Sequence, residues 1–202
     1  MIEKSAKLTW AGRVISKGTN PCLLSLLFLL LMAVTESMSA RLLTSSIIAL
    51  FLFLVVLPLA YVYLRTYRSG TGTRFKRDPT IFLKQHPKDI LIVGILFGIP
   101  GLVSLFLLEA APILLYTYAA LFIGSLVIAL CNMLYRVSYH LGAVTILVIM
   151  APAAWGQNFL VLLAAIPLVG WAKYQIGEHT IIQLLSGIVI AAFISGVVLV
   201  AY

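Results

Sequence analysis

The chain has 202 residues, of which 62% are hydrophobic and only 10% are charged, and its net charge is +8. A soluble domain of this size exposes far more Lys, Glu and Asp, so the composition excludes an ordinary soluble protein and indicates a multi-spanning membrane protein. The basic residues lie between apolar segments, and no basic helix with interleaved aromatics is present. This placement argues against nucleic-acid binding and in favour of membrane topology or phosphate headgroups as the reason for the charge.

The chain begins with a polar stretch, residues 1–21, which contains four basic residues. The apolar run that follows has no convincing small-residue cleavage site, so we expect a cytoplasmic polar tail before an uncleaved first span. Residues 22–202 are expected to form a single integral-membrane domain. The class is all-α, a bundle of six or seven transmembrane helices, because the first apolar run is short for a span. The expected spans are residues 22–35, 43–64, 90–108, 112–135, 141–156, 158–172 and 180–202.

Three polar clusters, residues 65–89, 136–140 and 173–179, are expected to share one membrane face with the tail. Two complete hairpins separate the clusters, so they return to the same side whether or not the first segment spans. If all seven segments span, this face carries 13 of the 14 Lys and Arg residues, and only Arg41 falls on the other. The positive-inside rule then places this face in the cytoplasm, in a protein of the plasma (inner) membrane.

The third polar cluster contains His179, six residues after Lys173 and four before Gln183. If a helix begins near Thr180, Gln183 lies one turn beyond His179 on the same helix face. Its carbonyl can then accept a hydrogen bond from one ring N–H, which fixes the tautomer and leaves the other nitrogen free to attack. The alternative is a helix-capping region whose histidine lies in the headgroup layer.

The second polar cluster places Ser138 and His140 just before an apolar helix. Unpaired N–H groups at a helix N-terminus attract anions, and a protonated His140 can donate a proton to a leaving oxygen. The alternative is an interfacial histidine, with Ser138 as the helix cap.

The first polar cluster contains Arg74, Lys76 and Arg77. A phosphate group needs several cations, and Arg offers bidentate contacts that Lys does not. Taken alone, this run is more typical of a solvated, topology-setting loop. The presence of all three clusters on one face favours a phosphate-handling site beside a bilayer.

Two of the clusters resemble motifs of the phosphatidic-acid phosphatase type 2 superfamily. The segment 172–183, which reads AKYQIGEHTIIQ, resembles the third motif: Ser-Arg, five residues, His, three residues, Asp. The segment 137–140, VSYH, resembles the second motif, Pro-Ser-Gly-His. The first motif, Lys, six residues, Arg-Pro, is matched poorly, because Gly70 stands at the lysine position and Asp78 separates Arg77 from Pro79. The resemblance covers roughly residues 65 to 195.

The resemblance implies a lipid-phosphate phosphatase, acting on phosphatidate or a polyprenyl (di)phosphate through a phosphohistidine. His179 would be the nucleophile, oriented by Gln183, and His140 would be the acid on the leaving alcohol. The phosphoryl oxygens would be held by Lys173, Ser138, Arg74, Lys76 and Arg77. No metal or other cofactor is implied, and the partners are the lipid phosphate and the surrounding membrane lipids.

The sequence departs from the family motifs at several positions. Gln183 stands in place of the Asp that would stabilise an imidazolium. Lys173 stands in place of an Arg and cannot make the bidentate contacts of a guanidinium. Val137 and Tyr139 replace Pro and Gly. These changes indicate a divergent branch, a slow enzyme, or a non-catalytic binder of phosphorylated lipids on the same scaffold. A transporter or channel is disfavoured, because the central parts of the spans hold almost no ionisable residues.

Overall fold

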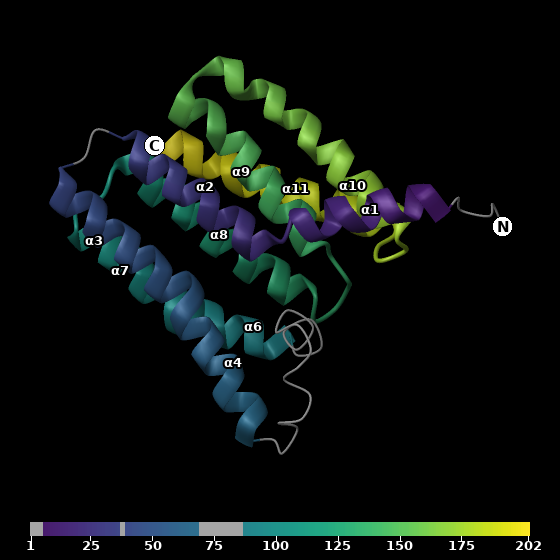
Figure 1. Cartoon of the computed structure of the whole chain (residues 1–202), viewed down its shortest axis with the longest axis horizontal. Coiled ribbons are helices and arrows are strands. Elements are labelled where there is room, and N and C mark those ends of the chain that lie inside the picture. The colour runs from purple at the N-terminus through teal and green to yellow at the C-terminus, as the bar shows by residue number, and fades with distance from the viewer. Residues whose placement is uncertain (1–5, 37–38, 69–86) are drawn as a thin grey trace.

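The computed structural model describes residues 6–36, 39–68 and 87–202, and every regular element within them is a helix (Figure 1). The expected all-α class is therefore confirmed. The helices are α1 (Ala6–Gly18), α2 (Pro21–Thr35), α3 (Ala40–Phe51), η1 (Leu52–Val56), α4 (Leu57–Arg68), α6 (Pro87–Val93), η3 (Gly94–Gly98), α7 (Ile99–Leu107), α8 (Pro112–Cys131), α9 (Tyr139–Trp155), η4 (Gln157–Ala164), α10 (Ala165–Gln175) and α11 (Ile181–Ala201).

The long apolar helices identify a membrane protein. Within the described ranges, four helices are long and apolar enough to cross a bilayer: Ala40–Tyr67, Lys88–Leu107, Pro112–Cys131 and Ile181–Ala201. A fifth is added if α1 and α2, which meet at a bend of 48°, count as one broken span. Helix α9 is apolar but shorter than this limit. The expected number of six or seven spans remains a prediction.

Helices α8, α9 and α11 pack against one another at the centre of the described structure. Three glycines permit their close approach: a Cβ at Gly187 would lie 2.8 Å from the Ser138 carbonyl oxygen, one at Gly142 would lie 2.4 Å from Ile128, and one at Gly124 would lie 2.5 Å from Ile146. Small residues at helix crossings are the usual way to bring membrane helices together. These contacts also align the N-termini of α9 and α11 at one end of the bundle.

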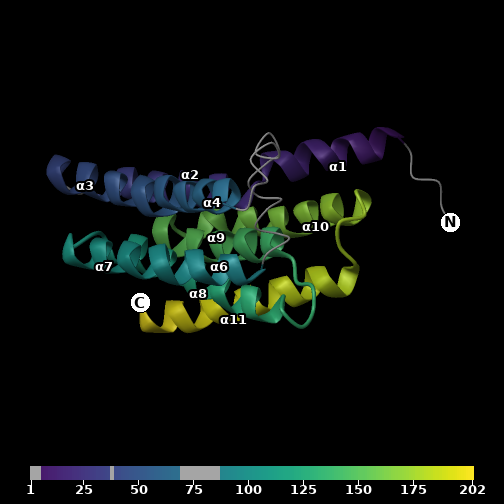
Figure 2. The same ribbon diagram turned by 90° about the horizontal axis from the view of Figure 1, so that it is seen from below.

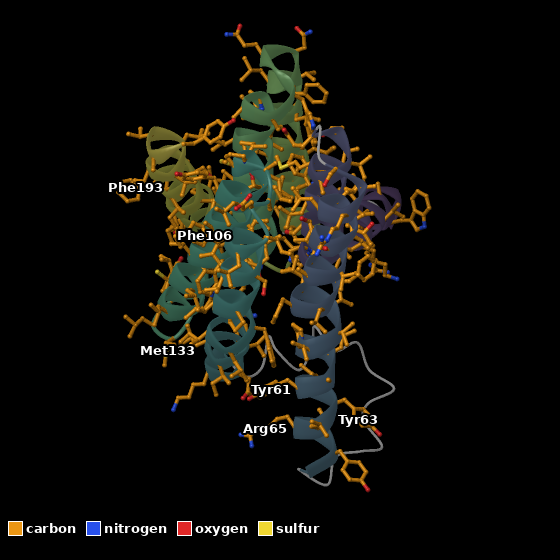
Figure 3. All side chains as sticks on the ribbon, turned by 90° about the vertical axis from the view of Figure 1, so that its left-hand side faces the viewer. Tyr61, Tyr63, Arg65, Phe106, Met133 and Phe193 are labelled. Carbon is orange, nitrogen blue, oxygen red and sulfur yellow. The ribbon has the colours of Figure 1, made fainter. Side chains whose placement is uncertain are left out.

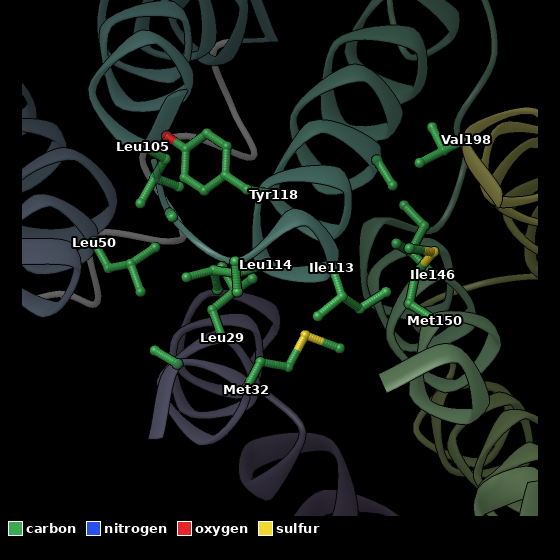
Figure 4. Close-up of a cluster of buried hydrophobic side chains, with 14 of the residues drawn as sticks. Leu29, Met32, Leu50, Leu105, Ile113, Leu114, Tyr118, Ile146, Met150 and Val198 are labelled. Atoms are coloured by element: carbon green, nitrogen blue, oxygen red, sulfur yellow. The ribbon is translucent and has the colours of Figure 1, made fainter. Parts of the chain in front are cut away.

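The apolar core lies between α2, α8 and their neighbours, where Leu29, Met32 and Leu114 are fully buried (Figure 4). The outer surface also carries many exposed apolar side chains, and Phe106 and Phe193 are among them (Figure 3). Contiguous exposed apolar surface on this scale is typical of a lipid-facing bundle.

Two membrane helices widen into a π-helix just before a proline. Segment η1 ends two residues before Pro58, and η3 ends two residues before Pro100. A proline in a helix has no N–H and clashes with the carbonyl four residues earlier, and that residue lies in the π-helical turn in both cases. Both prolines therefore coincide with a local widening of the helix.

The expected polar tail contains a helix, α1, over residues 6–18. Helix α1 bends away from α2 and lies along α10 (Figures 1 and 2). The contact depends on Gly12, where an added Cβ would lie 3.2 Å from the Ala172 carbonyl oxygen. Helix α1 has one packed and one exposed face, and burial of the packed face against α10 stabilises the helix.

Candidate functional site

The second and third polar clusters meet at the end of the bundle where α9 and α11 begin. The Ser138 backbone N–H donates to the Gln183 backbone carbonyl at 3.2 Å. The loop from α10 to α11 is closed by the Glu178 N–H, which donates to the Lys173 carbonyl at 3.2 Å, and by Gly177 at φ +74°. The expected convergence of these clusters at one end is therefore present in the described residues.

His179 is oriented by the first turn of α11. Thr180 caps this helix, and Gln183 completes a capping box in which its Oε1 accepts the Thr180 backbone N–H at 3.1 Å. The same oxygen lies 3.3 Å from His179 Nδ1, which confirms the contact predicted from the spacing. A backbone N–H only donates, so the atom facing His179 is the amide oxygen and Nδ1 carries the proton. His179 Nε2 is then left with a lone pair.

Burial lowers the pKa of His179 below its usual value of 6.5, and the charges of Lys173 and Arg136 lower it further. The hydrogen bond that His179 donates to Gln183 and the charge of Glu178 act in the opposite direction. Burial is the largest cause, because it penalises the charged imidazolium. His179 is therefore neutral at pH 7, which is the form that a nucleophile requires.

An open depression of about 380 Å³ surrounds this histidine. Its lining brings one cation, one carboxylate, one imidazole and one amide together with residues of the α10–α11 loop. The lining residues are Arg136, Tyr174, Gly177, Glu178, His179, Thr180 and Gln183. Arg136 is exposed and forms no ion pair within the described part of the chain. Its guanidinium is thus available to an anion in the depression.

Lys173 does not line the depression. Its side chain is 1% exposed, and Nζ donates to Glu178 Oε2 at 2.8 Å and to Ser16 Oγ of α1 at 2.7 Å. The sequence predicted direct phosphate binding by Lys173. In the structure its ammonium is engaged by a carboxylate and a hydroxyl, and it influences His179 through its charge.

Ser138 and His140 are also outside the lining. Ser138 is fully buried, and its hydroxyl accepts the Leu141 N–H at 3.4 Å, so it caps α9. This is the capping role that was the alternative to phosphate binding. His140, in the first turn of α9, is 9% exposed. The structure thus brings His179, Gln183 and Arg136 into one depression, and the buried residues Ser138, His140 and Lys173 are not part of its lining.

The remaining predicted cations, Arg74, Lys76 and Arg77, lie outside the described residues. Within the described ranges, no group of three or more His, Cys, Asp or Glu side chains could hold a metal ion.

Arg136 is the candidate residue that motif reasoning did not assign. It belongs to the polar cluster that contains Ser138 and His140, but it has no counterpart in the motif Pro-Ser-Gly-His. Its position directly before that motif was the available signal, because an Arg at the edge of an apolar segment has only the interface or a ligand to pair with.

No family model, curated protein or solved structure matches this chain.

Proposed function

We propose that this protein is a membrane phosphohydrolase that cleaves phosphate from a lipid phosphate through His179. The observation that carries the proposal is the His179 ring, held by Gln183 with its Nε2 lone pair free, beside the available Arg136 guanidinium in one depression. A neutral imidazole next to a phosphate-binding cation is what covalent phosphoryl transfer requires.

The proposed reaction has two steps. His179 Nε2 attacks the phosphorus, the bond to the leaving alcohol oxygen breaks, and the alkoxide takes a proton from a general acid. Water then attacks the phosphohistidine, which releases inorganic phosphate and regenerates the imidazole. Arg136 neutralises the phosphoryl oxygens in both steps. His140 stays the proposed acid, and because it is buried and does not line the depression, this role needs a bridging water or a local movement.

The substrate is proposed to be a lipid because the depression lies beside exposed apolar side chains. Ile181 and Ile182 follow the His179 loop, and Leu134 precedes Arg136; all three are exposed. An acyl or prenyl chain can remain against such side chains while its phosphate reaches the cation. We place this face in the cytoplasm, from the distribution of Lys and Arg.

A second candidate function is a non-catalytic receptor for phosphorylated lipids. Two observations favour it. Lys173 is already neutralised by Glu178, so the phosphate would meet fewer cations than the family motif supplies. Gln183 is neutral and cannot offset the charge that develops on His179.

Phosphate release by the purified protein in lipid nanodiscs separates the two functions. Phosphatidate and polyprenyl mono- and diphosphates are each supplied to the wild-type protein, His179→Ala and Gln157→Glu, the last as a control at the other end of the bundle. The phosphohydrolase proposal predicts release by the wild type and the control but not by His179→Ala. Binding of these lipids by all three proteins without release from any would replace it with the receptor.

A further inference from the structure

The outward face of α1 carries cations and apolar side chains together. Arg13 and Lys17 are both exposed, and neither forms an ion pair with another described residue. On the same face, Trp10 is 68% exposed and Val14 is 50% exposed. Spacings of three and four residues place these four side chains on one side of the helix. The α1 sequence, AKLTWAGRVISKG, contains no Asp or Glu.

The opposite face of α1 is fixed to the bundle. Gly12 packs against the backbone of α10, and Ser16 Oγ accepts a hydrogen bond from the buried Lys173 ammonium at 2.7 Å. The bend of 48° between α1 and α2 turns α1 away from the line of the first apolar helix (Figure 2). The orientation of the exposed face is therefore set by the fold.

We propose that the outward face of α1 is a binding site for anionic phospholipid headgroups at the membrane surface. An indole with an apolar body and a polar N–H is suited to the headgroup layer, and Val14 adds apolar area beside it. Arg13 and Lys17 supply the charge that attracts anionic lipids, with no acidic side chain in α1 to oppose them. A basic helix that carries a tryptophan on its exposed face and packs on the bundle through its other face fits a lipid surface.

An acidic protein partner is the main competing occupant, and the bilayer is favoured for two reasons. Only two residues separate the end of α1 from α2, an apolar helix that begins at Pro21, so the C-terminal end of α1 lies beside the headgroup layer. Its exposed face also combines apolar and basic side chains in a narrow strip, which suits a boundary between acyl chains and headgroups. The proposal does not depend on the proposed phosphohydrolase activity.

Tryptophan quenching in nanodiscs tests this site. The chain has three tryptophans, so a Trp155→Phe/Trp171→Phe background leaves Trp10 as the only fluorophore. Nanodiscs contain phosphatidylcholine with a minority of either brominated phosphatidylglycerol or brominated phosphatidylcholine at the same fraction. The site predicts at least about twofold stronger quenching by the brominated anionic lipid, because two cations enrich it locally.

Charge variants make the test specific. Arg13→Gln/Lys17→Gln is expected to abolish the preference for the anionic lipid, while Arg41→Gln/Lys88→Gln, which removes the same charge from other exposed positions, should leave it unchanged. Equal quenching by the two brominated lipids would overturn the proposal. Quenching only by aqueous iodide would also overturn it and would place α1 against water or a protein. If the tryptophan background does not fold, native mass spectrometry of the otherwise unaltered protein and both charge variants measures the same preference as retained anionic lipid.

Discussion

Replacing Gln183 with Glu is expected to raise the pKa of His179 without changing the orientation of its ring. Glutamate has the length of glutamine and is equally suited to the third helical position of a capping box, so its oxygen still reaches the Thr180 N–H and His179 Nδ1. Aspartate, the residue in the resembled motif, is one methylene shorter and is less able to serve both donors. Gln183→Glu is therefore the cleaner way to add the missing charge.

The magnitude follows from the separation of the two groups. At 3.3 Å between Nδ1 and the side-chain oxygen, Coulomb attraction between a carboxylate and an imidazolium amounts to about 1.3 kcal/mol even at the dielectric constant of water. This corresponds to roughly a tenfold change in the protonation equilibrium, in favour of the imidazolium. The same energy applied to the transition state would accelerate phosphoryl transfer about tenfold at a pH where His179 remains neutral before attack.

Nuclear magnetic resonance of histidine-labelled protein measures this effect without any assumption about activity. The chain has three histidines, and His179→Ala identifies the signal of interest. The wild type should show a neutral Nδ1–H tautomer that titrates below 6.5, and Gln183→Glu should keep this tautomer and titrate at higher pH. Gln157→Glu, the same change at the far end of the bundle, should leave the pKa of His179 unchanged. An Nε2–H tautomer in the wild type, or no change in Gln183→Glu, would refute the reasoning.

Further predictions concern packing, anion binding and pH. Gly187→Ala should lower stability by about 1–3 kcal/mol in thermal unfolding, because the added methyl meets a backbone carbonyl; Gly196→Ala, which meets nothing within 4 Å, should not lower it. Arg136→Gln should weaken binding of lipid phosphate by about tenfold or more, the loss of a charge-assisted contact, in equilibrium binding. Lys173→Met should lower the melting temperature through lost hydrogen bonds, and leave binding less affected than Arg136→Gln does. As pH falls, phosphate release should be lost only below pH 6.5, because burial holds the pKa of His179 below that value.

A different outcome would contradict each of these predictions. Equal stability of the two glycine variants would contradict the close approach of α9 and α11. A stronger loss of lipid binding in Lys173→Met than in Arg136→Gln would restore Lys173 as the direct phosphate contact. For the pH prediction the sign follows from the lowered pKa: His179 keeps its attacking lone pair until the pH falls below 6.5, and protonation then removes it. A loss of activity on acidification that already begins above pH 6.5 would contradict it.

The parts of the fold that were predictable from the sequence depend on local patterns. Long apolar runs marked the membrane helices, and the turn near Glu109, whose φ is +53°, was expected from the break between two runs. The contact of His179 with Gln183 follows from a spacing of four residues at a helix start, which needs no knowledge of the rest of the chain.

The features that were missed depend on contacts between distant residues. The bond from Lys173 to Ser16 joins positions 157 apart in the sequence, and it removes Lys173 from the depression. Helix α1 lies in a stretch whose composition reads as a polar tail, because the stabilising contact at Gly12 is with α10. The burial of Ser138 depends on Gly187 of α11 in the same way. Spacing within a motif does not report such contacts.

Trapping of a covalent phosphoenzyme tests the central proposal most directly. The wild-type protein in nanodiscs is mixed with a lipid carrying a radiolabelled phosphate and quenched in base, where phosphohistidine survives, and the labelled peptide is identified by mass spectrometry. The account predicts label on His179 during turnover and none in His179→Ala. Label on another residue, undiminished label in His179→Ala, or neither label nor phosphate release with any lipid phosphate would contradict it.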